Sequence, residues 1–305
     1  MPAQPTTGPG SIAVVILNHN GRQHLDPCLR AALALDGLPG PAAVVVADNG
    51  SDDGSVEHVR AAYPGVRVLP WGDNLGFAAG NDRAAEIVEA EHVLFLNNDT
   101  RITSDALRHL RKAVQDGTAC AGARLVSWDG RRLDFDGGGA SFTGHGHAAG
   151  HGQPVRSAPA GEPRDTLFAS GAAMLVERAV FLQVGGFDAG YFAYYEDVDF
   201  GWRLWLAGHR VVHVPAAVVH HRHHGTSGRW PAGVRARLFE RNALATVAKN
   251  YAPEHLPRLL AAALALAAVR AGASRGVIDA AAQDQAGLRP GVGGGIDGGR
   301  AVRGA

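Results

Sequence analysis

Three carboxylates, Glu196, Asp197 and Asp199, fall within four residues, directly after the aromatic stretch 191–195. Burying that much negative charge beside aromatic rings costs free energy unless each carboxylate has a partner or a function. Asp199 lies four residues before Arg203 in an expected helix, so we predict an ion pair between them. Glu196 and Asp197 have no such local partner, and the start of a helix favours their ionised forms. An ionised carboxylate at the edge of a pocket is suited to act as a general base.

Polar residues also follow four apolar runs in the first third of the chain. Asn18 ends the first run, Asp48 ends the second, Asn74 follows the third, and Asp99 follows the fourth. Asn and Asp are ordinary turn formers, so each turn taken alone is better explained by turn chemistry. Four such turns at one edge of a sheet favour a binding site instead. At that edge Asp48 is placed to accept a hydrogen bond from the imide N–H of uracil or thymine. Asp99 is placed to meet a divalent cation and diphosphate oxygens.

The elements that must position these residues alternate in type. Short apolar runs predict buried strands, and the amphipathic stretches between them predict helices. The expected strands are 12–17, 42–47, 66–69 and 92–96, and the expected helices are 23–35, 55–62, 77–90 and 104–115. This alternation indicates an α/β fold with a mostly parallel sheet and helices on both faces.

The rest of the chain is less regular. The Gly-, Pro- and His-rich segment 129–165 is interpreted as a mobile loop within an α/β domain spanning 11–250. A C-terminal helical extension is expected over 251–273, and disorder over 1–10 and 274–305. The apolar part of that last helix is too short to cross a bilayer, so it either packs on the domain or lies on a membrane surface, and packing is favoured.

Bulk composition excludes several classes of function. The formal net charge is zero at pH 7, so no basic field indicates nucleic acid as a partner. Cys28 and Cys120 have no metal-ligand spacing, which is typical of a protein in a reducing cytosol. The first ten residues lack the features of a signal peptide, so a cytoplasmic location is expected. The chain contains neither a Walker A motif nor a glycine-rich dinucleotide motif after a strand.

Taken in order, the polar motifs resemble those of family 2 glycosyltransferases, and in particular the rhamnosyltransferase-like bacterial enzymes. The resemblance covers roughly residues 11–250. The motifs that carry it are VVILNHN at 14–20, VADNGSDDGS at 46–55, NLGFAAGN at 74–81, LFLNNDT at 94–100, GAAMLV at 171–176, GGFD at 185–188, YYEDVD at 194–199 and PAAVVHH at 215–221.

The resemblance implies a GT-A fold, a nucleotide-diphosphosugar donor, a divalent metal (Mg²⁺ or Mn²⁺) and an inverting displacement. By position, Asp197 is the implied general base, with Glu196 as a supporting carboxylate on the acceptor side. Asp99 and His221 are the implied metal or diphosphate ligands. The implied donor-binding residues are Asn18, Asp48, Asn74, Asn97 and Asn98. The family's DxD-type motif reads Asn-Asn-Asp here, so only Asp99 brings negative charge to the metal.

These expectations combine into one predicted function. The chain is expected to move a sugar from a UDP- or dTDP-sugar to a hydroxyl of a glycan or lipid-linked acceptor, in cell-surface polysaccharide synthesis. A sugar-phosphate nucleotidyltransferase and a non-catalytic nucleotide-sugar-binding module are the alternatives.

Histidines crowd the stretch 213–224 and also occur at His145, His147 and His151. A zinc cluster is disfavoured because cysteines and a defined ligand spacing are missing. His220, His223 and His224 are expected to be solvated or packed, and the other three to belong to a flexible lid.

Overall fold

The computed structural model describes residues 10–38, 40, 43–115, 117–157, 161–222 and 231–287. The chain divides into two compact units, residues 1–263 and 264–305. The first unit carries the sheet and all of the predicted site residues. The segments 1–9 and 288–305, part of the predicted disordered ends, lie outside the described residues.

A ten-stranded mixed sheet forms the centre of the first unit, in the order β10-β12-β6-β11-β4-β1-β2-β3, with β5 added to β12 and β7 to β6. Its strands are β1 (Ile12–Asn18), β2 (Val44–Asp48), β3 (Arg67–Pro70), β4 (His92–Asn97), β5 (Thr100–Ile102), β6 (Cys120–Ser127), β7 (Leu133–Phe135), β10 (Arg164–Asp165), β11 (Ala173–Glu177) and β12 (Val211–His221). The N-terminal strands β3, β2, β1 and β4 are mutually parallel, and β11 lies antiparallel between β4 and β6. The four strands predicted for the first third of the chain are confirmed.

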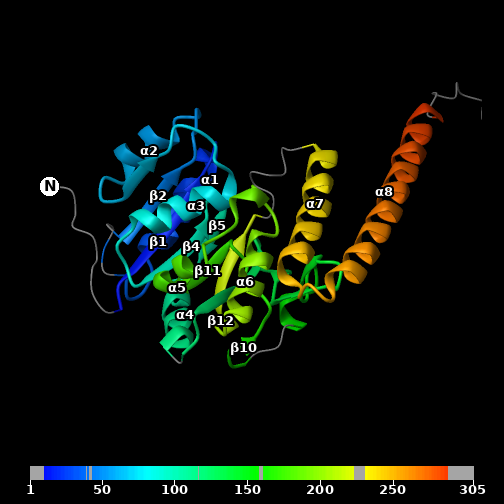
Figure 1. Ribbon diagram of the computed structural model, residues 1–305. Helices are drawn as coiled ribbons and strands as arrows, with labels where there is room; N and C mark the ends of the chain where they lie inside the picture. The colour runs from blue at the N-terminus through cyan, green and yellow to red at the C-terminus, as the bar shows by residue number, and fades with distance from the viewer. Residues whose placement is uncertain are drawn as a thin grey trace, which may run out of the picture. The chain divides into compact units, whose positions relative to one another are not determined.

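Helices cover both faces of this sheet (Figure 1). They are α1 (Arg22–Leu33), α2 (Ser55–Ala62), α3 (Gly76–Ile87), α4 (Ala106–Gln115), α5 (Arg178–Gln183) and α6 (Glu196–Leu206). Two further helices follow in the chain, α7 (Ala232–Asn250) and α8 (Leu256–Gly287). Successive residues of a strand point to opposite faces. Ile12, Val14 and Ile16 of β1 therefore pack with α1, α2 and α4, whereas Ala13 and Val15 pack with α3, α5 and α6. The two buried clusters explain why β1 reads as a continuous apolar run.

The pairing register brings the polar strand ends to one edge of the sheet. Asn18, the last residue of β1, pairs with Asp48 at the end of β2, and Leu17 pairs with Asn97 at the end of β4. Parallel pairing makes this alignment unavoidable once the apolar runs are in register. The predicted polar rim is confirmed as a feature of the fold.

The segment 129–165 contains more regular structure than a loop. It holds β7, the hairpin strands β8 (Gly138–Ala140) and β9 (Gly146–Ala148), the short helix η2 (Val155–Ser157) and β10. Asp136 anchors it by accepting from Arg124 Nε at 2.6 Å, Arg164 at 2.8 Å and His213 Nε2 at 2.9 Å. Although burial opposes ionisation, the bonds from His213 and Arg124 hold the pKa of Asp136 well below its ordinary value. The prediction of an irregular loop is therefore wrong. The buried ion network that holds the segment involves residues distant in sequence, so it leaves little trace in the local sequence pattern.

The C-terminal helices are longer than predicted. From Arg235 to Asn250 the sequence pattern predicts a helix, and α7 begins earlier, at Ala232; α8 continues to Gly287, past the predicted end at residue 273. High alanine content sustains a helix even without an amphipathic pattern, which explains the underestimate. Within the described residues, no helix is long and apolar enough to cross a membrane.

Candidate functional site

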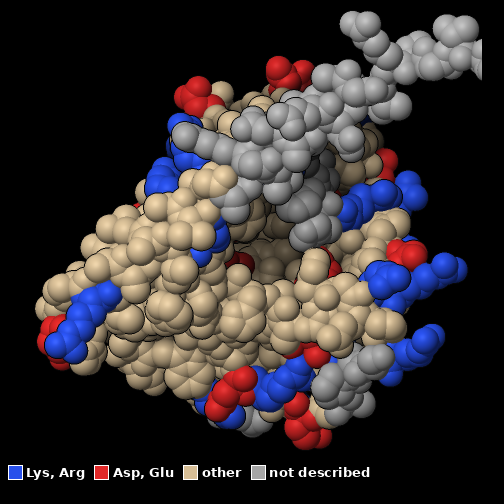
Figure 2. Space-filling model, turned by 90° about the vertical axis from the view of Figure 1, so that its right-hand side faces the viewer, with Lys and Arg blue, Asp and Glu red and all other residues tan. Residues whose placement is uncertain are grey.

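A cavity of about 400 Å³ opens at the polar edge of the sheet. A hollow is visible on the face shown in Figure 2, with acidic side chains inside it. Seven of the nine predicted site residues line the cavity, namely Asn74, Asn97, Asn98, Asp99, Glu196, Asp197 and His221. Aromatic side chains form much of the remaining wall: Phe77, Phe135, Phe168, Phe192, Tyr194, Tyr195 and Phe239. A cavity of this size with few convergent polar groups is typical of a small-molecule site.

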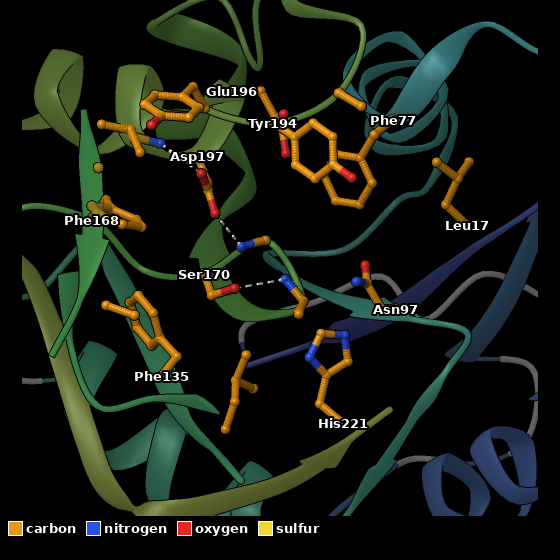
Figure 3. A pocket seen from close by; sticks show the side chains of 18 of the residues that line it. Leu17, Phe77, Asn97, Phe135, Phe168, Ser170, Tyr194, Glu196, Asp197 and His221 are labelled. Carbon is orange, nitrogen blue, oxygen red and sulfur yellow. Dashed lines mark hydrogen bonds between the residues drawn. The ribbon is translucent and has the colours of Figure 1, made fainter. Parts of the chain in front are cut away.

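Asp197 projects into the cavity from the first turn of α6 (Figure 3). One carboxylate oxygen, Oδ2, accepts a hydrogen bond from the Gly171 backbone N–H at 3.1 Å. The other, Oδ1, accepts from the Val198 N–H at 2.9 Å. Gly171 belongs to the turn before β11, so the carboxylate is aimed by two separate parts of the fold. Two backbone donors fix its orientation and leave acceptor capacity toward the cavity.

Glu196 is buried beside Asp197, with only 6% of its surface exposed. Its Oε2 atom has no hydrogen-bond partner among the residues that the structure describes. Burial, followed by repulsion from Asp197, raises the pKa of Glu196 well above its ordinary value. Burial also raises the pKa of Asp197 to about 6. Two adjacent buried carboxyls cannot both ionise cheaply, and the stronger burial and the repulsion at Glu196 make it the carboxyl of the pair that favours the protonated form.

The sequence prediction for this pair therefore needs correction. The helix start favours both ionised forms, but that effect is worth only about 1 kcal/mol. Desolvation of a fully buried carboxyl outweighs it, and for Glu196 the neutral form prevails. The prediction that the pair includes one ionised carboxylate at the edge of a pocket holds for Asp197.

Asp199 has a structural position, as predicted. Its Oδ2 accepts from Arg203 Nε at 2.8 Å, which confirms the expected i,i+4 pair. The same carboxylate also binds Lys249 at 2.9 Å and Asn250 at 3.0 Å, both on α7. Asp199 is completely buried and does not line the cavity. It therefore joins α6 to α7.

Asn18 and Asp48 lie behind the cavity wall rather than in it. Asn18 donates to Asp48 Oδ2 at 3.0 Å and accepts from Asn98 Nδ2 at 2.7 Å. Asp48 Oδ1 accepts from the Ser51 N–H at 2.9 Å. Both side chains are buried, and these bonds connect the ends of β1 and β2 to the turn after β4. Asp48 retains acceptor capacity, so its contact with a nucleobase stays a prediction.

Asn49, next to Asp48, is a cavity residue that the sequence did not single out. Its Nδ2 donates to Asn74 Oδ1 and to the Gly76 carbonyl, both at 3.0 Å, and its Oδ1 accepts from the Leu75 N–H at 3.0 Å. These bonds shape the turn that presents Asn74, whose side chain is exposed. The sequence signal that could have identified Asn49 as a cavity residue is its position directly after Asp48, the polar residue that ends a predicted strand.

His221 lies on the other side of the cavity from Asp197 (Figure 3), and it contacts Asp99. His221 Nε2 lies 3.3 Å from Asp99 Oδ1, and His221 Nδ1 lies 2.6 Å from Asp134 Oδ2. Although burial lowers it, the hydrogen bonds with Asp134 and Asp99 raise the pKa of His221 to about 9. Asp134, on β7, was missed because it lies within the supposed loop.

The donor atoms at this position fit a hard divalent cation. Asp99 supplies a carboxylate oxygen, and His221 supplies an imidazole nitrogen once a cation displaces the proton that its raised pKa keeps on the ring; both residues line the cavity. Magnesium-type ions in proteins usually take one or two carboxylates and complete their coordination with substrate phosphates and water. The described residues contain no group of three His, Cys, Asp or Glu side chains arranged to hold a metal by themselves. A cation here therefore needs oxygens from a ligand.

The remaining histidines are dispersed. His147 and His151 line the cavity, and His151 Nδ1 lies 3.0 Å from the Asp134 carbonyl oxygen. His220 points elsewhere, with its Nδ1 at 3.3 Å from the carbonyl oxygen of Trp128. His223 and His224 lie outside the described residues.

Comparison with known proteins identifies the family. A family model described as "Glycosyltransferase like family 2" matches residues 9–241. The chain belongs to this glycosyltransferase family. It is 34% identical over 248 residues to N-acetylglucosaminyl-diphospho-decaprenol L-rhamnosyltransferase of Mycobacterium tuberculosis, covering 72% of this chain and 79% of the relative. It is also 50% identical over 56 residues to the rhamnosyltransferase WbbL of Escherichia coli, covering 18% of this chain and 21% of that one.

Solved structures share the fold. GalNAc-T7 with UDP, GalNAc and Mn²⁺ aligns with a TM-score of 0.61 at 17% identity, over 78% of this chain and 47% of that chain. The mannosyltransferase PcManGT of Pyrobaculum calidifontis, in complex with GDP-Man and Mn²⁺, aligns with a TM-score of 0.56 at 16% identity, over 92% and 84%. TarS 1–349 of S. aureus in complex with UDP-GlcNAc aligns with a TM-score of 0.55 at 16% identity, over 83% and 71%. The predicted GT-A fold and the rhamnosyltransferase-like family are confirmed, and the chain is a glycosyltransferase.

Proposed function

We propose that this glycosyltransferase moves a sugar, with inversion, from a UDP- or dTDP-sugar to a hydroxyl of a lipid-linked glycan. The observation that carries the proposal is the placement of one ionised carboxylate, Asp197, across a single cavity from His221, which contacts Asp99. A single displacement needs a base for the acceptor and charge stabilisation for the leaving group, and these two sides of the cavity supply both.

Asp197 is proposed as the general base. The pKa of a sugar hydroxyl is far above 7, so its proton must be removed as the oxygen attacks the anomeric carbon. Asp197 is aimed by the Gly171 and Val198 N–H groups, and burial raises its pKa to about 6, which makes it more basic than an exposed aspartate. It stays ionised at neutral pH because Glu196 keeps the proton of the pair. The protonated Glu196 is left to donate a hydrogen bond to a substrate oxygen.

The donor diphosphate is proposed to bind at Asp99 and His221. A divalent cation held there supplies positive charge where the departing diphosphate gains negative charge. Asp134 binds the Nδ1 side of His221, which leaves Nε2 directed toward Asp99. Such a carboxylate behind a histidine fixes the orientation of the ring. Asn97 and Asn98 add amide groups to the same edge.

The acceptor is proposed to enter along the aromatic wall. Flat aromatic faces offer apolar contact to the carbon faces of sugars and to lipid chains. The M. tuberculosis relative bears a name that specifies a decaprenyl-diphosphate-linked acceptor and rhamnosyl transfer, and this likeness supports a lipid-linked acceptor here. Sheet-edge polar residues and the aromatic wall thus divide the cavity between donor and acceptor.

Measuring sugar transfer from a panel of UDP- and dTDP-sugars, dTDP-rhamnose included, to a synthetic prenyl-diphosphate-linked glycan tests this proposal. We expect one nucleotide sugar to raise the melting temperature of the protein and to be consumed with release of nucleoside diphosphate. Anomeric inversion is read from the product by NMR. Failure of every nucleotide sugar to bind would refute the proposal, and retention of configuration would refute the single displacement.

Peripheral attachment to the inner face of the plasma membrane is a separate part of the proposal. α8 exposes Leu264, Leu266 and Val269, with 51%, 40% and 67% of their surfaces accessible. Apolar side chains near the basic residues Arg258 and Arg270 suit the surface of an anionic bilayer. Co-flotation with anionic vesicles should be lost when the chain is truncated at Tyr251. If the truncated protein floats with the vesicles as well as the full chain does, the proposal of membrane attachment through α8 is wrong.

A further inference from the structure

The segment that leads into the proposed base has a strained backbone. Phe192, Tyr194 and Tyr195 have φ angles of 64°, 69° and 72°, in the left-handed region that residues with side chains avoid. At Phe192 the pair φ 64°, ψ −59°, with the Ala193 N–H donating to the Tyr191 carbonyl at 2.8 Å, forms a γ-turn of the strained hand. Each such residue costs on the order of 1–3 kcal/mol, and such strain persists only where surrounding contacts enforce it.

One side chain on α7 supplies most of that enforcement. Asn242 is almost completely buried, with 1% of its surface exposed. Its Nδ2 donates to the carbonyl oxygens of Tyr194 at 2.6 Å, Ala193 at 2.9 Å and Tyr191 at 3.2 Å. A single amide group thus contacts the carbonyls of Tyr191, Ala193 and Tyr194, and the Tyr191 carbonyl also accepts from Arg241 and from the Ala193 N–H. Removing the amide takes a donor away from the Ala193 and Tyr194 carbonyls, and the loss of such a bond at a buried carbonyl costs about 1–3 kcal/mol.

Neighbouring groups hold the same segment at other atoms. The Phe77 N–H, at the start of α3, donates to the Phe192 carbonyl at 2.6 Å. The Tyr194 ring stacks on Phe239 of α7 with ring centroids 4.6 Å apart. The segment therefore lies between α3 and α7, and Asn242 holds its Ala193 and Tyr194 carbonyls.

These contacts determine where Asp197 points. α6 begins directly after Tyr195, so the carbonyls held by Asn242 are three to six residues before Asp197 in the chain. The Gly171 and Val198 N–H groups orient the carboxylate itself, whereas the segment 191–195 sets where the first turn of α6 lies relative to Gly171. We propose that Asn242 is a positioning residue for transfer, holding the strained segment 191–195 so that the Asp197 carboxylate faces the cavity. This inference rests on the proposed function, in which Asp197 is the base.

Two substitutions at Asn242 and one control separate positioning from general stability. Asn242→Asp keeps the shape but replaces the donating N–H groups with a carboxylate oxygen facing three carbonyls. Asn242→Ala removes the donors without adding charge. Thr246→Val is the matched control, since Thr246 lies on the same face of α7 and is fully buried, with its hydroxyl 2.9 Å from the Tyr191 hydroxyl. It removes a buried hydrogen bond from α7 but leaves the three carbonyls bound.

We expect kcat to fall about 100-fold in both Asn242 variants, because misplacing a reacting group by about 1 Å has an effect of that size. The KM for the nucleotide sugar should change less than about twofold, since Asp99 and His221 lie across the cavity. The acid limb of the rate profile should move to higher pH as Asp197 loses the Gly171 N–H. Thr246→Val should lower the urea midpoint while keeping kcat and the acid limb of wild type.

Hydrogen–deuterium exchange provides a readout that does not depend on catalysis. Amides of residues 192–197 should exchange at least tenfold faster in the Asn242 variants, while those of the later turns of α6 stay protected. Unchanged exchange in 192–197, or wild-type kcat in a folded Asn242→Asp variant, overturns the inference. An equal loss of kcat in Thr246→Val also overturns it. Should the wild-type protein transfer no sugar, the proposed function fails, and the exchange result still decides whether Asn242 holds the segment.

Discussion

Replacing Asp197 with asparagine should separate activity from stability. The amide has the shape of the carboxylate but cannot take a proton from an acceptor hydroxyl. Removal of a general base usually lowers the rate by about 100-fold to 10,000-fold, so we expect kcat to fall by at least 100-fold. The wild-type enzyme should itself lose activity about tenfold for each pH unit below 6, because the pKa of Asp197 is about 6.

The same substitution should stabilise the fold above pH 6. The pKa of Asp197 is about 6 in the folded protein, against an ordinary value of 3.8. Ionising this buried carboxyl therefore costs about 3 kcal/mol of stability. An asparagine avoids that cost but accepts from only one of the Gly171 and Val198 N–H groups, which removes about 1 kcal/mol. The expected net gain is about 2 kcal/mol.

The stability difference between wild type and Asp197→Asn should depend on pH. Because the folded-state pKa is raised, the folded state binds the proton more tightly than the unfolded chain does between pH 4 and 6. Wild-type stability from this group is thus complete below about pH 4 and is lost as the pH rises through 6. The advantage of Asp197→Asn should therefore appear between pH 4 and 6 and remain constant above.

Urea unfolding at pH 4, 6 and 8 measures this advantage, and release of nucleoside diphosphate in the presence of acceptor measures activity. Asp36→Asn, at an exposed position outside the cavity, serves as the control and should change neither quantity. The reasoning is refuted by a stability difference that does not vary with pH, or by an Asp197→Asn variant that transfers sugar at a rate within threefold of wild type.

Three further outcomes are expected. Removing divalent ions with EDTA should lower transfer at least tenfold, and adding Mn²⁺ or Mg²⁺ should restore it; full activity in EDTA would contradict a metal at Asp99. Asp134→Asn should weaken Mn²⁺ binding about 10-fold to 100-fold in an EPR titration with nucleotide present, because the Asp134 carboxylate, 2.6 Å from His221, orients the His221 ring. Unchanged Mn²⁺ binding would show that Asp134 does not orient His221 for the metal. Gly76→Ala should lower the free energy of unfolding, measured in urea, by about 2–3 kcal/mol. The reason is that Gly76 has φ +83° and an added Cβ would lie 2.5 Å from the Phe192 ring. An unchanged urea midpoint would show that the ring moves aside.

Local patterns were sufficient for the parallel half of the sheet. The strands β1, β2 and β4 are buried on both faces, so their sequences are continuously apolar, and a polar residue marks the point where each ends. The i,i+4 pair of Asp199 and Arg203 was equally predictable, because it depends only on helix geometry. The motif order 14–221 identified the family for the same reason, since polar strand ends recur in a fixed sequence along the chain.

Long-range contacts were not predictable in this way. Asp134 and Asn242 belong to segments with no motif, and each becomes part of the site through partners that lie far away in sequence, 87 residues for the bond to His221 and 48 for the bond to the Tyr194 carbonyl. The folding of segment 129–165 depends on the buried network around Asp136, which includes His213, 77 residues away. No spacing rule predicts such pairs.

The amino-acid sequence alone determined the family, the α/β order of elements and the candidate polar residues, because strand and helix periods are local properties of the chain. It did not determine the protonation of the Glu196–Asp197 pair. That was decided by tertiary packing, which removes both carboxyls from water and leaves one proton between them. The strained entry into α6 is likewise set by tertiary contacts, since its cost is offset only by Asn242 and the other groups that α3 and α7 bring to it.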